Sequence, residues 1–87
     1  MNAADENRAE LDRALENVNR VGALMAQLNE LLDEIRESFV LVGIQGSANT
    51  SVVAALSIVE GMDRGIDEYL GKIFALRIAI ATYRDFL

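Results

Sequence analysis

Apolar residues recur along the first half of the chain at alternating intervals of three and four residues. This spacing places them on one face of an α-helix, whereas a β-strand would need a period of two, which Leu31-Leu32 beside Asp33-Glu34 breaks. Charged and amide side chains fill most of the positions between them. The pattern therefore predicts an amphipathic helix over about residues 4–42. Its apolar positions are Leu11, Ala14, Val18, Val21, Met25, Leu28, Leu32, Ile35, Phe39 and Val42.

The second half of the chain repeats this spacing from Val52 to Leu87, with no charged residue at any apolar position. Its β-branched residues lower the intrinsic helix propensity by only about a few tenths of a kcal/mol each. Burial of the apolar face outweighs so small a cost, and a second helix is predicted over about residues 51–86. The apolar positions are Val52, Ala55, Val59, Met62, Ile66, Tyr69, Ile73, Leu76, Ile80, Tyr83 and Leu87.

The only cluster of helix-breaking residues lies between these two patterns, and we interpret residues 43–50 as a bend. Gly43 or Gly46 can adopt the left-handed conformation that ends a helix. The residues able to cap the next helix are Ser47, Asn49, Thr50 and Ser51. Two helices of equal length joined by a short connection pack side by side, so residues 1–87 are predicted to form a single helical-hairpin domain with two long antiparallel helices.

The second helix is apolar on more than the one face that the first helix can cover. Such a helix is normally buried on several sides, so we expect an all-α fold in which the hairpin pairs into a four-helix bundle or a larger helical assembly. The partner is either a second copy or another helical protein. A membrane surface is disfavoured because surface-binding helices usually carry Lys and Arg on their polar face. The predicted partner interface consists of Leu24 and Leu31 on the first helix and Leu56, Ile58, Leu70, Phe74, Ile78 and Phe86 on the second.

The composition excludes several kinds of chemistry. The chain has no Cys and no His, which removes disulfides, thiolate nucleophiles, ordinary zinc or haem ligands and the commonest general base. Its net charge of −6 has the wrong sign for binding the phosphates of a nucleic acid. Carboxylates four residues apart, such as Glu30 and Glu34, fall on the outward face and lack the His of a di-metal bundle site. We therefore expect a non-enzymatic protein without cofactor, metal or catalytic residue.

The N-terminal segment is charged and lacks the apolar core of a cleavable signal peptide. The most apolar run, residues 73–81, is shorter than the ~20 residues that span a bilayer, and it includes Arg77. We expect the chain to be made in the cytoplasm, and either to remain there or to be secreted without a cleavable signal peptide.

An acidic chain of 87 residues without Cys, with two equal helices around a Gly-bearing bend, resembles the WXG-type small helical-hairpin proteins of type VII secretion. Where that family has Trp-x-Gly, this bend reads Val42-Gly43-Ile44-Gln45-Gly46. The family's export signal is a Tyr with an acidic residue four positions later. In this chain the residue four positions after Tyr83 is Leu87. The resemblance implies an adaptor or co-chaperone that forms a homodimer, or a heterodimer with a sister hairpin or with the helical N-terminal region of a larger secreted protein.

Two other functions are compatible with the same residues. A helical hairpin with exposed apolar positions can serve as a cytoplasmic oligomeric scaffold or regulatory adaptor. Its acidic outer face can also neutralise a basic partner, in the manner of an antitoxin. All three functions require a surface that binds another protein.

Overall fold

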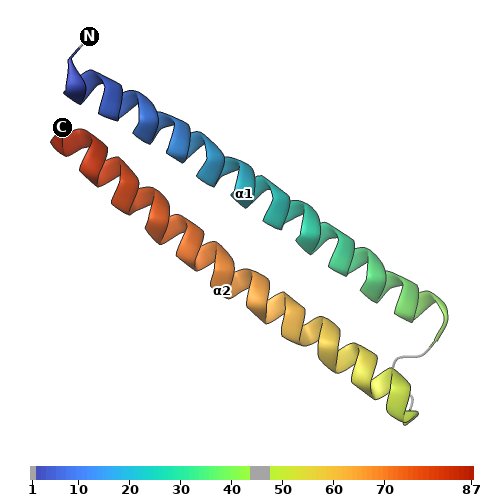
Figure 1. Cartoon of the computed structure of the whole chain (residues 1–87). Coiled ribbons are helices and arrows are strands. Elements are labelled where there is room, and N and C mark those ends of the chain that lie inside the picture. Colours follow the sequence, from blue (N-terminus) through green and yellow to red (C-terminus); the bar gives the residue numbers. More distant parts are fainter. Residues whose placement is uncertain (1, 44–47) are drawn as a thin grey trace.

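A computed structural model describes residues 2–43 and 48–87, and the described chain consists of two helices (Figure 1). Helix α1 spans Ala3–Leu41 and helix α2 spans Thr50–Phe86, with no strand in the described segments. Each helix begins one residue before the predicted start. The all-α fold expected from the apolar periodicity is confirmed.

Both helix starts are capped by an asparagine. The side-chain oxygen of Asn2 accepts a hydrogen bond of 2.9 Å from the amide of Asp5, and the acidic residues Asp5 and Glu6 in the first turn suit the positive end of the helix dipole. At the start of α2, Asn49 Oδ1 accepts from the amides of Ser51 at 2.9 Å and Val52 at 3.4 Å. Asn49 is one of the four predicted caps, whereas the cap at Asn2 was not predicted.

The bend begins where α1 ends in a left-handed glycine. The amide of Val42 still donates to the carbonyl of Ser38, and Gly43 follows with a φ of 70°. Only glycine adopts this conformation without a steric cost, which explains why the helix stops here. The predicted role of Gly43 is confirmed, while Gly46 and Ser47 lie outside the described residues.

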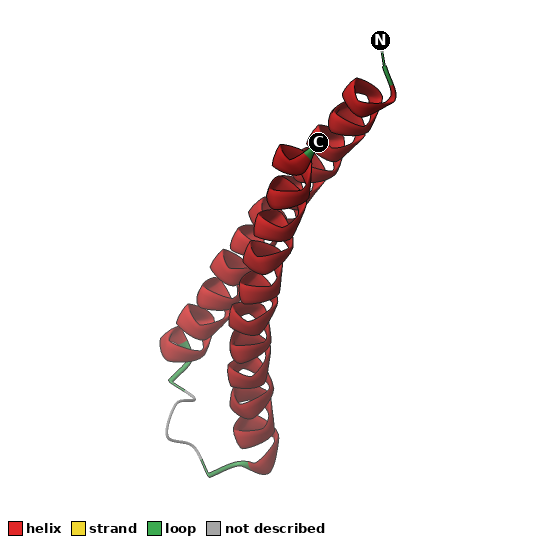
Figure 2. Ribbon diagram, turned by 90° about the vertical axis from the view of Figure 1, so that its left-hand side faces the viewer, coloured by secondary structure: helices red, strands yellow, loops and turns green. Residues whose placement is uncertain are grey.

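The two helices run antiparallel in a rod of 64 × 17 × 14 Å, and Figure 2 shows them side by side from a second direction. The centre of their contact is Leu32, only 1% exposed, which packs with Val59 and Ile66. Met25, Phe39 and Leu70 pack around this cluster. At the other end the Arg8 guanidinium donates to the backbone carbonyl of Leu87, which joins the two termini of the chain.

Candidate interaction surface

The helices touch along one row of residues on each, spaced by seven. All of these residues are buried or partly buried, and we call them the contact rows. A seven-residue spacing is typical of helices that remain in contact over many turns. On α1 the contact row is Leu11, Val18, Met25, Leu32 and Phe39, and on α2 it is Val52, Val59, Ile66, Ile73 and Ile80.

One flank of each contact row is closed against the other helix. Most residues four positions after a contact-row residue are partly buried, and we call these positions the closed flanks. They include small or polar residues such as Gly22 and Asn29. The residues are Leu15, Gly22, Asn29 and Arg36 on α1, and Leu56, Asp63, Leu70 and Arg84 on α2.

Ion pairs between the helices lie along the closed flanks. Arg36 Nη2 lies 2.7 Å from Asp63 Oδ2 on α2, and Arg36 Nη1 lies 2.5 Å from Asp33 Oδ1 on its own helix. The hydrogen bond with Asp63, the largest cause, raises the pKa of Arg36 above its ordinary value. Arg36 therefore stays charged and ties the two helices together on this side.

A second ion pair joins Arg84 to Asp12 near the termini, through both carboxylate oxygens of Asp12. The hydrogen bond from Arg84 lowers the pKa of Asp12 below the ordinary aspartate value, and the same bond raises the pKa of Arg84. Both groups are largely solvent-exposed, so this pair adds only a little stability.

The opposite flanks are open, which differs from the sequence-based expectation. The regular steps of three and four predicted that Val21, Leu28 and Ile35 would face the other helix, but each is more than a third exposed. The helices are instead rotated towards the closed flanks, where Arg36 reaches Asp63 on α2. This rotation leaves an apolar stripe on each helix uncovered.

The two uncovered stripes lie on the same side of the hairpin. In an antiparallel pair, equivalent flanks of the two helices lie on the same side. The positions three residues after the contact row of α1 therefore lie beside the positions three residues after the contact row of α2. Exposed apolar side chains three positions after, or one before, a contact-row residue therefore form one surface, which we call the apolar face. It comprises Val21, Leu24, Leu28, Leu31 and Ile35 on α1, and Ile58, Met62, Tyr69, Leu76 and Tyr83 on α2, and Phe86, three residues after Tyr83, extends it to the end of α2.

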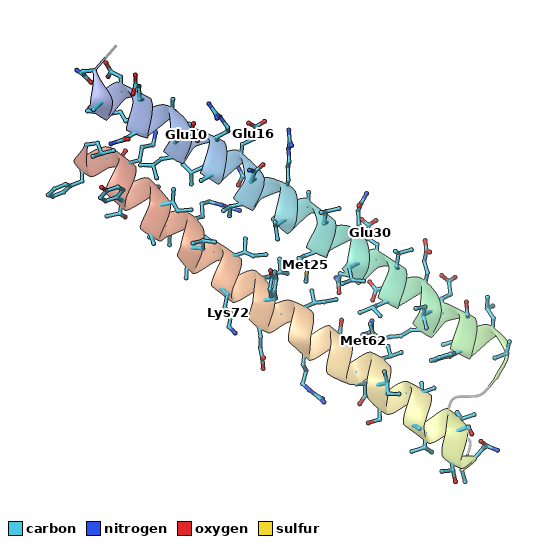
Figure 3. The ribbon with its side chains drawn as sticks, in the orientation of Figure 1. Glu10, Glu16, Met25, Glu30, Met62 and Lys72 are labelled. Atoms are coloured by element: carbon cyan, nitrogen blue, oxygen red, sulfur yellow. The ribbon has the colours of Figure 1, made fainter. Side chains whose placement is uncertain are left out.

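Most charged residues lie elsewhere on the rod, with Glu10 and Lys72, each one residue before a contact-row residue, as exceptions. Figure 3 shows Glu16 and Glu30 on the side of α1 that faces away from α2, while Met25 points into the space between the helices. The helices thus separate three environments: a narrow core, an apolar face and an acidic outer surface. A contiguous apolar surface of this kind is typical of an interaction site.

The apolar face is hollowed at the end of α2. A shallow hollow of about 450 Å³ is lined by Ala79, Thr82, Tyr83 and Phe86, and Phe86 is 88% exposed. The facing half of α1 carries short or polar side chains at the corresponding positions, such as Ala14 and Asn17. The hollow is large enough to receive apolar side chains from another molecule.

The eight residues predicted for the partner interface fall into three groups. Leu24, Leu31, Ile58 and Phe86 lie on the apolar face, between 55% and 88% exposed. Leu56 and Leu70 are partly buried in the closed flank of α2, and Leu70 packs against the core cluster. Phe74 and Ile78 are exposed on the part of α2 turned away from the apolar face, so the structure does not bring them together with the first four.

The sequence interpretation missed most of the apolar face. It placed Leu28 and Met62 in the core, because the steps of three and four follow the apolar residues three positions after each contact-row residue and pass over those four positions after it. A signal for the closed flanks was present in the sequence. Arg36 and Asp63 have opposite charges, and both lie four residues after a contact-row residue, at matching levels of an antiparallel pair. Oppositely charged residues at such positions favour contact between the flanks that carry them.

No family model, curated protein or solved structure matches this chain. Among the described residues, no three acidic side chains converge in a way that could hold a metal ion. Neither described helix combines the length and apolar character needed to cross a membrane.

Proposed function

We propose that this protein is a non-enzymatic interaction module, a small helical adaptor or co-chaperone that binds a helical partner through the apolar face. The observation that carries the proposal is the exposure of large apolar side chains along one side of both helices, with Leu24 62% and Ile58 63% exposed. Burying side chains of this size contributes about 1.5–3 kcal/mol each relative to leaving them in water. A helical partner fits best, since helices already form both edges of the surface.

We further propose that the partner is linked to type VII secretion, as the resemblance to WXG-type hairpins implies. The helices of 39 and 37 residues around a left-handed glycine support this assignment through architecture. The protein would then accompany a larger effector as an adaptor, either remaining in the cytoplasm or leaving it without a cleavable signal peptide. Export that stops when the secretion ATPase of such a system is deleted would support the link, and unchanged export would contradict it.

A second candidate is an antitoxin-like protein or oligomeric scaffold that binds a basic partner. The uneven distribution of acids favours this alternative, because residues 21–71 contain eight acidic and only two basic residues. Strong salt dependence of partner binding distinguishes it from a mainly apolar association.

Affinity capture from the native organism tests the proposed function directly. Tagged wild-type protein should retain its partner, and Leu24→Glu, on the apolar face, should lose it. Ala23→Glu is the matched control, because Ala23 is exposed on the outer side of the same turn and receives the same charge. If the two variants retain the same partners as the wild type, the apolar face is not the binding surface.

A further inference from the structure

We propose that the apolar face is covered by a second copy of this chain, packed end over end, so that the bend of each copy lies over the termini of the other. This inference rests on the proposed interaction function and names the partner. In this arrangement α1 packs on α1 and α2 packs on α2, both antiparallel, and the four helices form a bundle with a two-fold axis.

The distribution of charge along the rod sets the orientation. Residues 21–71, the half nearer the bend, hold eight acids and two bases, while the remaining residues hold six acids and six bases. The whole net charge of −6 therefore lies in one half of the rod. Two copies with their bends together would place these two acidic halves side by side, whereas the end-over-end dimer places each against a neutral half.

The second helix supplies the clearest pairing. Its half nearer the bend is acidic, with residues such as Glu60, Asp67 and Glu68, and its half nearer the C-terminus carries the bases Lys72 and Arg77. When α2 packs antiparallel on α2 of the second copy, each acidic half meets a basic one. Of these charges Lys72, one residue before Ile73, and Glu68 lie towards the apolar face, whereas Glu60, Asp67 and Arg77 lie towards the other flank. Together they orient association over a longer range rather than supply its free energy.

The shape of the apolar face fits the same arrangement. Large side chains such as Leu28 and Leu31 occupy it on α1 only in the half nearer the bend, while the hollow beside Ala79 and Tyr83 lies at the opposite end. End-over-end packing brings the exposed Ile58 and Met62 of one copy over the hollow of the other. Every layer of the bundle then combines large and small side chains, which fills the interior evenly.

The surface is large enough for a stable dimer. A face of about 64 × 17 Å covers roughly 1,000 Å² on each copy, so that complete overlap buries about 2,000 Å² in total, at the upper end of ordinary specific interfaces. The dimer also needs no other molecule to cover the apolar face, because in a two-fold symmetric dimer each copy covers the apolar face of the other.

The distance between labels placed at the bend tests the orientation. The chain has no Cys, so Ala48→Cys, at an exposed position, carries a single spin label whose separation in the dimer is measured by electron double resonance. The end-over-end dimer predicts about 60 Å, close to the length of the rod. A dimer with both bends at one end predicts roughly 20–30 Å, because neighbouring helices pack at 8–10 Å.

A second label keeps the test decisive if the first one disturbs the bend. Ala9→Cys lies on the exposed surface near the N-terminus, and mixing copies labelled at residue 9 with copies labelled at residue 48 should give the short distance. A short distance between two labels at residue 48 would overturn the end-over-end dimer. A helical protein that stays monomeric would overturn the second copy as partner, while the capture experiment would still decide the proposed interaction function.

Discussion

Replacing Ile58 with glutamate should separate the two copies without unfolding the hairpin. Ile58 lies on the apolar face and is 63% exposed in the single hairpin, so α1 protects little of it. Full burial of an isoleucine side chain contributes about 1.5–3 kcal/mol, so covering the remaining two thirds contributes about 1–2 kcal/mol for each copy. The two-fold axis doubles this contribution to about 2–4 kcal/mol per dimer.

That loss converts to a weaker dimer by a factor of about 30 to several hundred, since each 1.4 kcal/mol is tenfold in Kd. The buried carboxylate adds a further desolvation cost in the same direction. Isothermal dilution calorimetry gives the dimer Kd without a label, and circular dichroism of the same samples shows whether the helices persist. We expect Ile58→Glu to retain the helical signal at concentrations where the wild type is dimeric.

Ser57→Glu is the matched control. Ser57 is the preceding residue, is exposed and points away from the apolar face, yet it gains the same charge in the same acidic half. Its Kd should change by less than about fivefold, as expected for a surface substitution. Equal weakening by both variants would show a general effect of charge, and an unchanged Kd for Ile58→Glu would refute the burial of this residue in the dimer.

Three other substitutions probe the hairpin itself. Leu32→Ala should lower the free energy of unfolding by about 2–5 kcal/mol because Leu32 is fully buried, as urea unfolding followed by circular dichroism would measure, whereas Leu31→Ala should act mainly on dimer affinity. Gly43→Ala should lower the free energy of unfolding by about 1–2 kcal/mol in the same assay, because φ is 70° at this position. An unchanged free energy would show that alanine adopts this conformation without strain. Because Arg84 lowers the pKa of Asp12, the pair stabilises the fold above the ordinary aspartate pKa of 3.8, and this contribution is lost as pH falls through the lowered value. Thermal melts at neutral and acidic pH should therefore show a smaller acid-induced loss for Asp12→Asn than for the wild type, and equal losses would contradict the link.

The sequence was sufficient to predict the two helices, their antiparallel packing and a left-handed glycine at the end of α1, with Gly43 and Gly46 as the candidates. These features depend on local rules, namely the spacing of apolar residues and the conformational freedom of glycine. The closed flank could not be read from the same pattern, because Val21 and Leu28 look like better core residues than Gly22 and Asn29. Hydrophobicity shows that a side chain will be buried, but it does not distinguish burial within one hairpin from burial between two.

The interface residues show the same limit. Leu70, which was predicted to contact a partner, is partly buried and packs against the core cluster of its own hairpin. Phe74 is exposed, but it lies on the side of α2 turned away from Ile58. The rotation of α2 about its axis separates these residues, and that rotation depends on contacts such as Arg36 with Asp63, which involve both helices.

The mass of the wild-type protein in solution tests the central claim most directly. Sedimentation equilibrium measures it without labels or substitutions, at concentrations from a few to a few hundred micromolar. If the apolar face binds a second copy, the mass should be twice the 9.5 kDa of the chain over most of this range. A mass of 9.5 kDa throughout, with the helical signal intact, would contradict the account.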